Sequence, residues 1–171
     1  MRAIGDVAVE EELIEPLRFE DLFTAEQHRL FGALCLITRD PHEAEEIGQE
    51  AFARLWERWD RVGSMVDPTG YLYRAAMNLM RSRYRRARVA ARLVVEGTTR
   101  QDEISEADDR DEVERMLSGL NRQQRSALVL TALLGYSSDE AGALLGMRGS
   151  TVRVLSTRAR AALRTQALEV R

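Results

Sequence analysis

Apolar residues recur at intervals of three and four along nearly the whole chain, which is the spacing of one face of an α-helix. The clearest case is the segment DPHEAEEIGQEAFARLWERW, in which Ala44, Ile47 and Ala51 share one side. No stretch alternates β-branched and polar residues as a strand would, and the 171 residues include only three prolines. The sequence therefore predicts an all-α fold.

Short capping motifs divide this pattern into separate helices. The first combines Asp40 as N-cap, Pro41 at the first helical position and Glu43 as the third residue of a capping box. Two more capping boxes begin at Asn121 and at Ser137. We expect helices over residues 19–38, 42–59, 68–93, 111–120, 121–135, 137–145 and 150–168, with a loop at 61–66.

Charge is segregated along the chain, although the whole sequence has a net charge of only −3. Residues 1–67 have a net charge of −9, residues 68–100 of +7, residues 101–117 of −6 and residues 118–171 of +5. All 25 basic residues are arginine, whose forked donors suit phosphate. This alternation favours a protein that binds both nucleic acid and a protein partner. The polar stretch 95–110 is predicted to be a flexible acidic linker between two small helical domains.

The last part of the chain has the spacing of a helix-turn-helix. A short helix from Asp139 to Leu145, a turn at Gly146 and a longer helix from Thr151 match that motif, whose second helix enters the major groove. Polar residues at steps of four, three and four form an outward stripe on the longer helix. The candidate DNA-binding residues here are Ser150, Thr151, Arg153, Thr157, Arg160 and Arg164. A helical hairpin with a solvated basic face is the alternative for this segment.

A second basic stripe lies in YLYRAAMNLMRSRYRRARVAARL, residues 71–93, which contains seven arginines and no acid. One side of the predicted helix presents Asn78, Arg81, Arg85, Arg88 and Arg92, with Tyr84 beside them. An ordinary solvated helix, which is the alternative, usually mixes Glu with Arg to form i,i+4 pairs. Without such pairs the arginines repel one another, which favours the binding of an external polyanion. Nucleic-acid phosphate is the usual one.

The sequence offers little support for catalysis or metal binding. His28 and His42 have no partners at metal-ligand spacing, so both are expected at the surface. Cys35 is interpreted as core filling, and a single cysteine fits a reducing, cytoplasmic location. The sequence has no glycine-rich phosphate loop, no recognisable signal peptide and no apolar run of membrane-spanning length. We therefore expect no catalytic residues, no cofactor and no membrane insertion.

Three segments together resemble the extracytoplasmic-function (ECF) type of bacterial RNA polymerase sigma factor. HEAEEIGQEAFARLW is similar to the segment A-E-D-L-V-Q-E-x-F-x-x-x-W that binds core polymerase. PTGYLYRAAMNLMRSRYRRAR is similar to the segment that recognises the downstream (−10) promoter element and melts the duplex. The stretch from Leu120 to Leu163 is similar to the helix-turn-helix that binds the upstream (−35) element. The resemblance spans residues 19–168 with the three motifs in order.

The resemblance also implies roles for particular residues. Those expected to contact the polymerase clamp are Glu45, Glu46, Gln49 and Glu50. Those expected at the downstream element and the melted strand are Tyr71, Asn78, Arg81, Tyr84, Arg85 and Arg88, with loop 61–66 beside a flipped base. The stripe that begins at Ser150 would meet the upstream element. Tyr71 stands where the family has Trp and can stack in the same way, whereas Val154 and Leu155 replace a frequent Ser-Arg pair.

The expected layout is an acidic extension over 1–18, sigma region 2 over 19–94, a linker over 95–110 and sigma region 4 over 111–168. Such a chain would bind core RNA polymerase, direct it to promoters and help melt the DNA. Its expected partners are core polymerase, promoter DNA and, as in many relatives, an anti-sigma factor. The alternative is a helix-turn-helix regulator that binds duplex operators as a symmetric dimer. The orientation of the two domains does not follow from the sequence.

Overall fold

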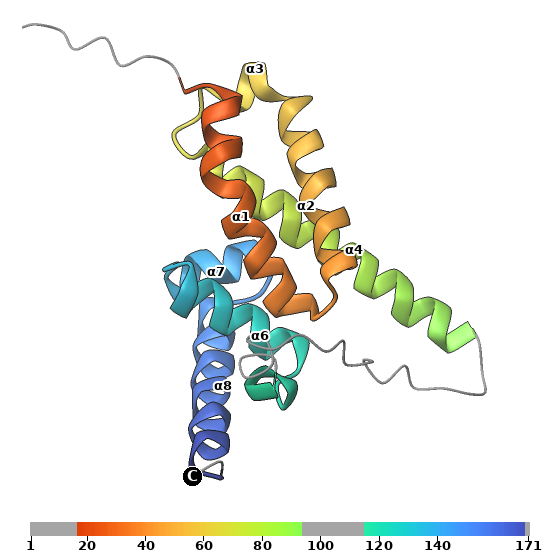
Figure 1. The fold of residues 1–171 in the computed structure, drawn as a ribbon, viewed down its shortest axis with the longest axis vertical. Coiled ribbons are helices and arrows are strands. Elements are labelled where there is room, and N and C mark those ends of the chain that lie inside the picture. The colour runs from red at the N-terminus through yellow and green to blue at the C-terminus, as the bar shows by residue number, and fades with distance from the viewer. Residues whose placement is uncertain (1–16, 94–114, 170–171) are drawn as a thin grey trace, which may run out of the picture.

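The computed structural model describes residues 17–93 and 115–169, and its only regular elements there are helices, so the predicted all-α fold is confirmed (Figure 1). The first domain contains α1 (Phe19–Thr38), α2 (Pro41–Trp56), α3 (Trp59–Val62) and α4 (Pro68–Leu93). The second contains α6 (Arg122–Leu128), the π-helical turn η1 (Val129–Leu133), α7 (Ser138–Leu145) and α8 (Gly149–Glu169). The predicted linker 95–110 and most of the extension 1–18 lie outside the described residues.

In the first domain, α1, α2 and α4 pack around one apolar core. The largest side chains buried there are Leu30, Leu34, Ile37, Ile47, Leu55, Leu72, Tyr73 and Met77. Arg39 ends α1 in the left-handed conformation, with a φ of 61°. Asp40 then caps α2 as predicted, because its carboxylate accepts hydrogen bonds from the backbone N–H of His42 (2.9 Å) and of Glu43 (3.1 Å). The predicted capping box is not completed, because the Asp40 N–H donates to the Thr38 hydroxyl and the Glu43 carboxylate bonds to Arg122.

The second helix is shorter than its sequence pattern predicts. Residues 42–59 have continuous helical spacing, but α2 ends at Trp56 and a separate turn, α3, follows. Val62 in that turn is fully buried, and the ring of Trp59 packs edge-on against Phe19 with centroids 5.5 Å apart. Trp59 is therefore a core-edge residue, as its spacing indicates, but it reaches the core from a different element.

In the second domain, both predicted capping boxes are present, at Asn121 with Gln124 and at Ser137 with Glu140. The predicted helix 121–135 departs from α-helical geometry in its second half, where η1 replaces the last turns. The carbonyl of Leu134, just after η1, accepts a hydrogen bond of 3.3 Å from Arg29 on α1. A π-helical turn of this kind is commonly retained where a tertiary contact uses it.

The turn between α7 and α8 depends on two glycines. Gly146 has a φ of 65°, the left-handed conformation that the sequence predicts for the helix-turn-helix turn. Gly142, one turn earlier, lies so close to the chain that a Cβ there would be 2.7 Å from the carbonyl oxygen of Met147. The tight turn fixes the angle at which α8 leaves α7.

The two domains dock against each other along α1 and α4. Buried residues of both domains form one continuous hydrophobic cluster, and the rings of Tyr73 and Tyr136 pack across the boundary with centroids 5.9 Å apart. Arg125 of α6 is only 6% exposed, and its Nε donates to the carbonyl of Ile37 at the end of α1 over 2.9 Å. A cation suits that position because the last carbonyls of a helix lack partners within the helix.

We expect this docking to survive cleavage of the connecting segment. The sequence alone predicts that trypsin, cutting at the arginines of 95–110, releases two independent helical pieces. Because the domains share a core, the pieces should instead co-elute on gel filtration, and Tyr136→Ala should weaken their association by removing the ring that packs on Tyr73. Independent elution of the wild-type pieces would contradict the docking.

Stability at alkaline pH provides a further test of this core. Burial, and then the nearby carboxylate of Glu26, raise the pKa of Tyr73, whose hydroxyl donates to Glu26 over 2.9 Å. A raised folded-state pKa means that the unfolded chain loses the proton first, from about pH 10. The free energy of unfolding should therefore fall as the pH rises above about 10, and Tyr73→Phe should reduce that fall. Urea denaturation between pH 8 and 11 measures it, and the sequence has no lysine to titrate in the same range.

Candidate functional site

The polar residues of α2 divide between two neighbouring surfaces. Glu45 and Gln49 are exposed and bonded to each other, with 3.1 Å between Gln49 Nε2 and Glu45 Oε1. Glu46 and Glu50 point instead toward α4. The four residues predicted to contact polymerase are therefore contiguous, but two of them, Glu46 and Glu50, form ion pairs with another helix.

Arg83 of α4 explains the orientation of the second pair. Its guanidinium forms an ion pair with Glu46 and lies 3.4 Å from an oxygen of Glu50. The hydrogen bond to Glu46 is the main reason that the pKa of Arg83 is raised. Glu50 also pairs with Arg54 over 2.6 Å. The two pairs with Arg83 join α2 to α4, whereas the pair with Arg54 lies within α2. All three are partly exposed, so each stabilises the fold by only about 0.2–1 kcal/mol.

Beside the other pair, a groove of about 550 Å³ runs between α1 and α2. Both apolar and polar side chains line it, and Glu45 and Gln49 are among them. Its lining residues are Phe23, Gln27, His28, Leu30, Phe31, Glu45, Gly48, Gln49 and Phe52. His28 is exposed, as predicted. The groove offers an apolar surface next to acidic and amide groups, which suits a protein partner better than a nucleic acid.

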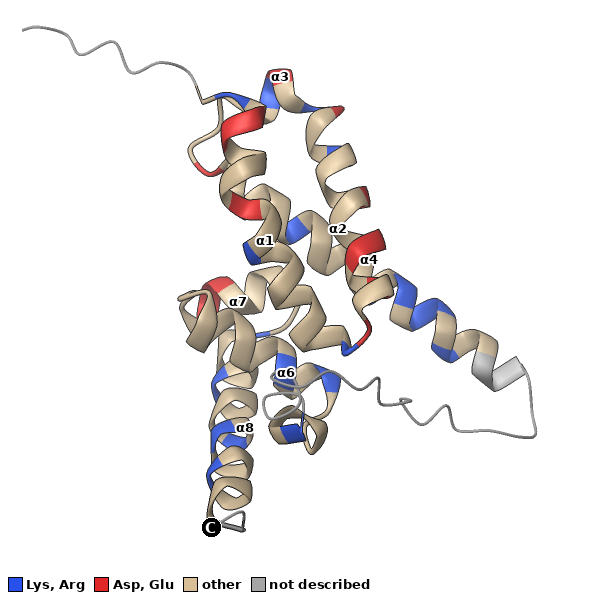
Figure 2. Ribbon diagram, viewed as in Figure 1, with Lys and Arg blue, Asp and Glu red and all other residues tan. Residues whose placement is uncertain are grey.

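Most arginines of α4 lie on its later turns (Figure 2), and Arg83 among them pairs with acids of α2. Asn78, Arg81, Tyr84, Arg85 and Arg88 are all exposed, as the stripe requires, and the side chain of the predicted Arg92 lies outside the described part. The guanidinium of Arg88 lies over the Tyr84 ring, 5.9 Å from its centroid. In the described residues, no acid pairs with Arg81, Arg85 or Arg88, so their charge is available to an anion.

The start of α4 adds an aromatic and an apolar element. Tyr71 is half-buried and its hydroxyl accepts a hydrogen bond of 2.8 Å from Arg58. In the preceding loop, Met65 and Val66 are exposed, and Val66 has no protein surface against it. Exposed apolar side chains on a loop next to a basic helix can stack against bases that have left the helix.

The stripe on α8 is also arranged as predicted. Val152 and Ala159 are buried against the rest of the domain, whereas the polar residues of the stripe face outward. The exposed residues are Ser150, Thr151, Arg153, Thr157, Arg160 and Arg164. The Thr157 hydroxyl donates to the carbonyl of Arg153 over 2.8 Å, which leaves the arginines as the groups able to reach phosphate.

Two kinds of site can be addressed directly in the described residues. They contain no group of three or more His, Cys, Asp or Glu residues that could hold a metal ion. None of their helices combines the length and the apolar composition that a membrane crossing needs.

Sequence patterns alone missed residues that join one helix to another. Arg83 belongs to the basic stretch 71–93 in the sequence, but in the structure it faces α2. Arg122 reaches from α6 to Glu43 of α2, with Nη2–Oε2 and Nη1–Oε1 distances of 3.2 and 3.4 Å. The helical angle of Arg83, on the opposite side of α4 from Arg81 and Arg88, is the one signal that could have separated it from the stripe.

Two family models match this chain. Residues 22–107 match Sigma-70 region 2, and residues 110–163 match Sigma-70, region 4. The boundary between the two matches falls in the segment that separates the two helical domains. The match explains the acidic helix, the basic stripe and the helix-turn-helix together. It favours a sigma factor over the alternative of a dimeric regulator that binds duplex operators.

Known proteins agree with the family models. The RNA polymerase sigma-E factor of Streptomyces avermitilis is 30% identical over 155 residues, covering 89% of this chain and 86% of that protein. The ECF RNA polymerase sigma factor SigW of Bacillus subtilis is 26% identical over 164 residues, with 86% and 88% covered. The structure of the sigma factor RpoE in complex with the anti-sigma factor NepR from Bartonella quintana matches with a TM-score of 0.63 at 22% identity, covering 86% of this chain and 94% of that chain. The chain therefore belongs to the ECF-type RNA polymerase sigma factors, with sigma-70 regions 2 and 4.

Proposed function

We propose that this sigma factor binds core RNA polymerase through α2, contacts promoter DNA through α4 and α8, and helps to melt the duplex in the cytoplasm. Sigma factors direct RNA polymerase to promoters and are initiation factors rather than enzymes. The observation that best supports the assignment of surfaces is the contrast between α2, whose exposed face is acidic, and the later turns of α4, which are basic without acids.

The polymerase surface that we propose combines the four polar residues of α2 with the groove beside them. Glu45 and Gln49 supply exposed acceptors, and Phe23 and Phe52 supply an adjacent apolar floor. Interfaces with lasting affinity usually combine an apolar centre with a polar rim. Glu46 and Glu50 extend the rim, although each must share its charge with Arg83.

For promoter melting we propose a path along the loop before α4 and the first half of that helix. Met65 and Val66 would lie against bases that leave the stack, and Asn78 and Arg81 would meet the exposed base edges. Asn78 is exposed and makes only a long contact, 3.5 Å, with Arg81, so its amide can both donate to and accept from a base. Holding unpaired bases offsets the cost of separating the strands.

The docked arrangement bears on how this function is controlled. The stripe of Arg81, Tyr84, Arg85 and Arg88 faces α6 and α7 across a cleft, so promoter DNA can lie along α4 only after region 4 moves away. We therefore propose that polymerase separates the domains. An anti-sigma factor that holds them together would inhibit, and the RpoE structure that this chain resembles is itself a complex with an anti-sigma factor.

The function as a whole is tested by a pull-down with core RNA polymerase followed by run-off transcription from a library of promoters. We expect stable association and promoter-dependent transcripts. A protein that fails to bind core polymerase but protects a palindromic duplex as a dimer would refute the proposal.

We expect the upstream element to contribute less to transcription than the downstream one. Val154, 49% exposed at the contact face of α8, offers no hydrogen bond to a base edge, whereas Arg153, Arg160 and Arg164 can reach the backbone. Scrambling either element should reduce run-off transcription. The loss on scrambling the downstream element should be several-fold larger than the loss on scrambling the upstream element. Equal losses would contradict a recognition helix that contacts mainly phosphate.

A further inference from the structure

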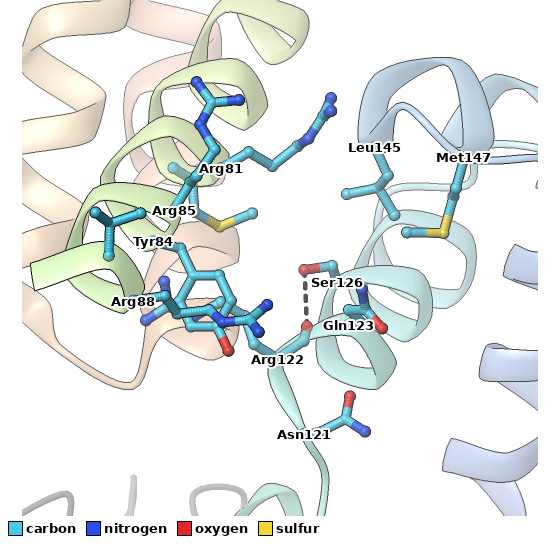
Figure 3. A pocket seen from close by; sticks show the side chains of 12 residues that line it. Arg81, Tyr84, Arg85, Arg88, Asn121, Arg122, Gln123, Ser126, Leu145 and Met147 are labelled. Atoms are coloured by element: carbon cyan, nitrogen blue, oxygen red, sulfur yellow. Dashed lines mark hydrogen bonds between the residues drawn. The ribbon is translucent and has the colours of Figure 1, made fainter. Parts of the chain in front are cut away.

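A cleft of about 670 Å³ opens between the two domains, with α4 on one side and α6 and α7 on the other. Four arginines line it, three from α4 and one from the start of α6, and Figure 3 shows their side chains around the cleft. The four are Arg81, Arg85, Arg88 and Arg122. Among the described residues that line the cleft there is neither Asp nor Glu.

Three of the four arginines, Arg81, Arg85 and Arg88, form no ion pair with a described acid. Arg81 reaches across to α7, where a Cβ on Gly146 would collide with its guanidinium. Arg122 lies over the Tyr84 ring, 4.9 Å from the centroid, and Arg88 approaches the same ring at 5.9 Å. Of the four, only Arg122 pairs with a described acid, Glu43. Like charges gathered in this way raise the energy of the docked state unless an anion enters.

We propose that this cleft binds a small polyphosphate anion, either inorganic polyphosphate or the phosphate chain of a nucleoside polyphosphate, and that the bound anion holds the two domains together. Arginine forks bind phosphate oxygens in pairs, and successive phosphates can satisfy forks from both α4 and α6 at once. Gln123 adds an exposed amide on the α6 side. Leu145 and Met147 add apolar surface to the cleft, against which the base of a nucleotide would pack.

The proposal goes beyond promoter binding, although it shares three arginines with it. A ligand that bridges α4 and α6 favours the docked state, and promoter DNA needs the same arginines in the undocked state. The two must therefore oppose each other, by the reciprocity of linked equilibria. Binding to the free protein needs neither polymerase nor DNA, so its failure is distinguishable from failure of the proposed function.

The test is isothermal titration calorimetry of the full chain with tripolyphosphate, with GTP and with orthophosphate, each at the same ionic strength. Two substitutions probe the opposite walls: Arg85→Ala on α4 and Gln123→Glu on α6, which places an acid in the cleft. Each has a matched control. Arg86→Ala removes the same charge from another side of α4, and Ala132→Glu adds the same charge at an exposed position outside the cleft.

We expect tripolyphosphate to bind more tightly than orthophosphate, with the dissociation constant raised about tenfold or more by Arg85→Ala and by Gln123→Glu, and little changed by the controls. Tighter binding of GTP than of tripolyphosphate would identify a nucleotide, and equal binding would identify the phosphate chain alone. Equal affinity of Gln123→Glu and Ala132→Glu would overturn the proposal, since α4 alone would then bind the anion. Absence of binding by all three probes would overturn it as well.

The bound state gives a second readout. After trypsin has cut the connecting segment, tripolyphosphate should slow the dissociation of the two docked pieces of the wild-type protein and not of Gln123→Glu. It should also raise the concentration of core polymerase needed for half-maximal holoenzyme formation. An equal effect of tripolyphosphate on the wild-type protein and on Gln123→Glu would overturn the proposal, because the anion would then act by general screening of charge.

Discussion

Replacing Glu46 and Glu50 together by arginine should abolish binding of core polymerase. The double variant places two positive charges on the proposed polymerase surface of α2, and reversing charges in a complementary interface costs several kcal/mol, on the order of a 100-fold loss of affinity or more. The same change also breaks the ion pairs with Arg83, so loss of binding alone would not prove direct contact. Surface plasmon resonance with immobilised core polymerase measures the affinity.

A third substitution separates the two explanations. Adding Arg83→Glu to the double variant restores opposite charges between α2 and α4 while the outward face remains reversed. We expect the triple variant to recover the small stability loss, about 1 kcal/mol in thermal denaturation, without recovering polymerase binding. Recovery of binding in the triple variant would mean that Glu46 and Glu50 act by positioning Arg83 and α4.

Local features of this fold could be predicted from the sequence because their causes are local. Asp40, Asn121 and Ser137 each satisfy backbone N–H groups within three residues of themselves, so the helix starts were visible without tertiary information. Gly146 likewise occupies a conformation that is set by its own turn. The faces of α4 and α8 followed from the helical period, and the exposed residues are those that the period indicates.

The features that could not be predicted arise from contacts between distant segments. Whether Glu46 faces solvent or Arg83 depends on how α2 packs against α4, 37 residues further along the chain. The burial of Arg125 depends on a carbonyl of α1 that is 88 residues away. A charged residue on a polar helix face gives no sign of such a partner. The docking of the domains, and with it the cleft, was for this reason absent from any pattern in the sequence.

The docking also suggests why the acidic and basic segments alternate. In the docked protein the α4 stripe faces region 4. Three acids of α2 pair with arginines of other helices: Glu46 and Glu50 with Arg83 of α4, and Glu43 with Arg122 of α6. These acids offset part of the basic charge at short range, and the acidic segments lower the long-range field that would attract any DNA. The basic stripe would then become fully available only on polymerase, which limits indiscriminate binding by the free protein.

On the promoter, two groups of residues in the stripe should make different contacts, one with phosphates and one with bases. Arg88, on the later turns of α4, should neutralise a phosphate, whereas Asn78, on the earlier turns, should meet a base exposed by melting. Arg88→Ala should therefore weaken holoenzyme binding to any sequence and reduce the slope of log affinity against log salt by about one unit. Asn78→Ala should leave that slope nearly unchanged and reduce open-complex formation, at a cost of roughly 1–3 kcal/mol.

The positions of Asn78 and Arg88 in the structure explain why the two variants should differ, and they also provide a control. Asn78 lies outside the interdomain cleft and lines a different cavity of α4 together with Arg86, whereas Arg88 lines the cleft itself. Arg86→Ala removes the same charge as Arg88→Ala from another side of the helix, so it should leave the salt slope closer to that of the wild type. The measurement is open-complex formation on duplex and pre-melted promoters across a salt series. If Arg88→Ala and Asn78→Ala behave alike on both templates, the stripe contacts only phosphates and makes no base contact, because a lost base contact cannot change with salt as a lost phosphate contact does.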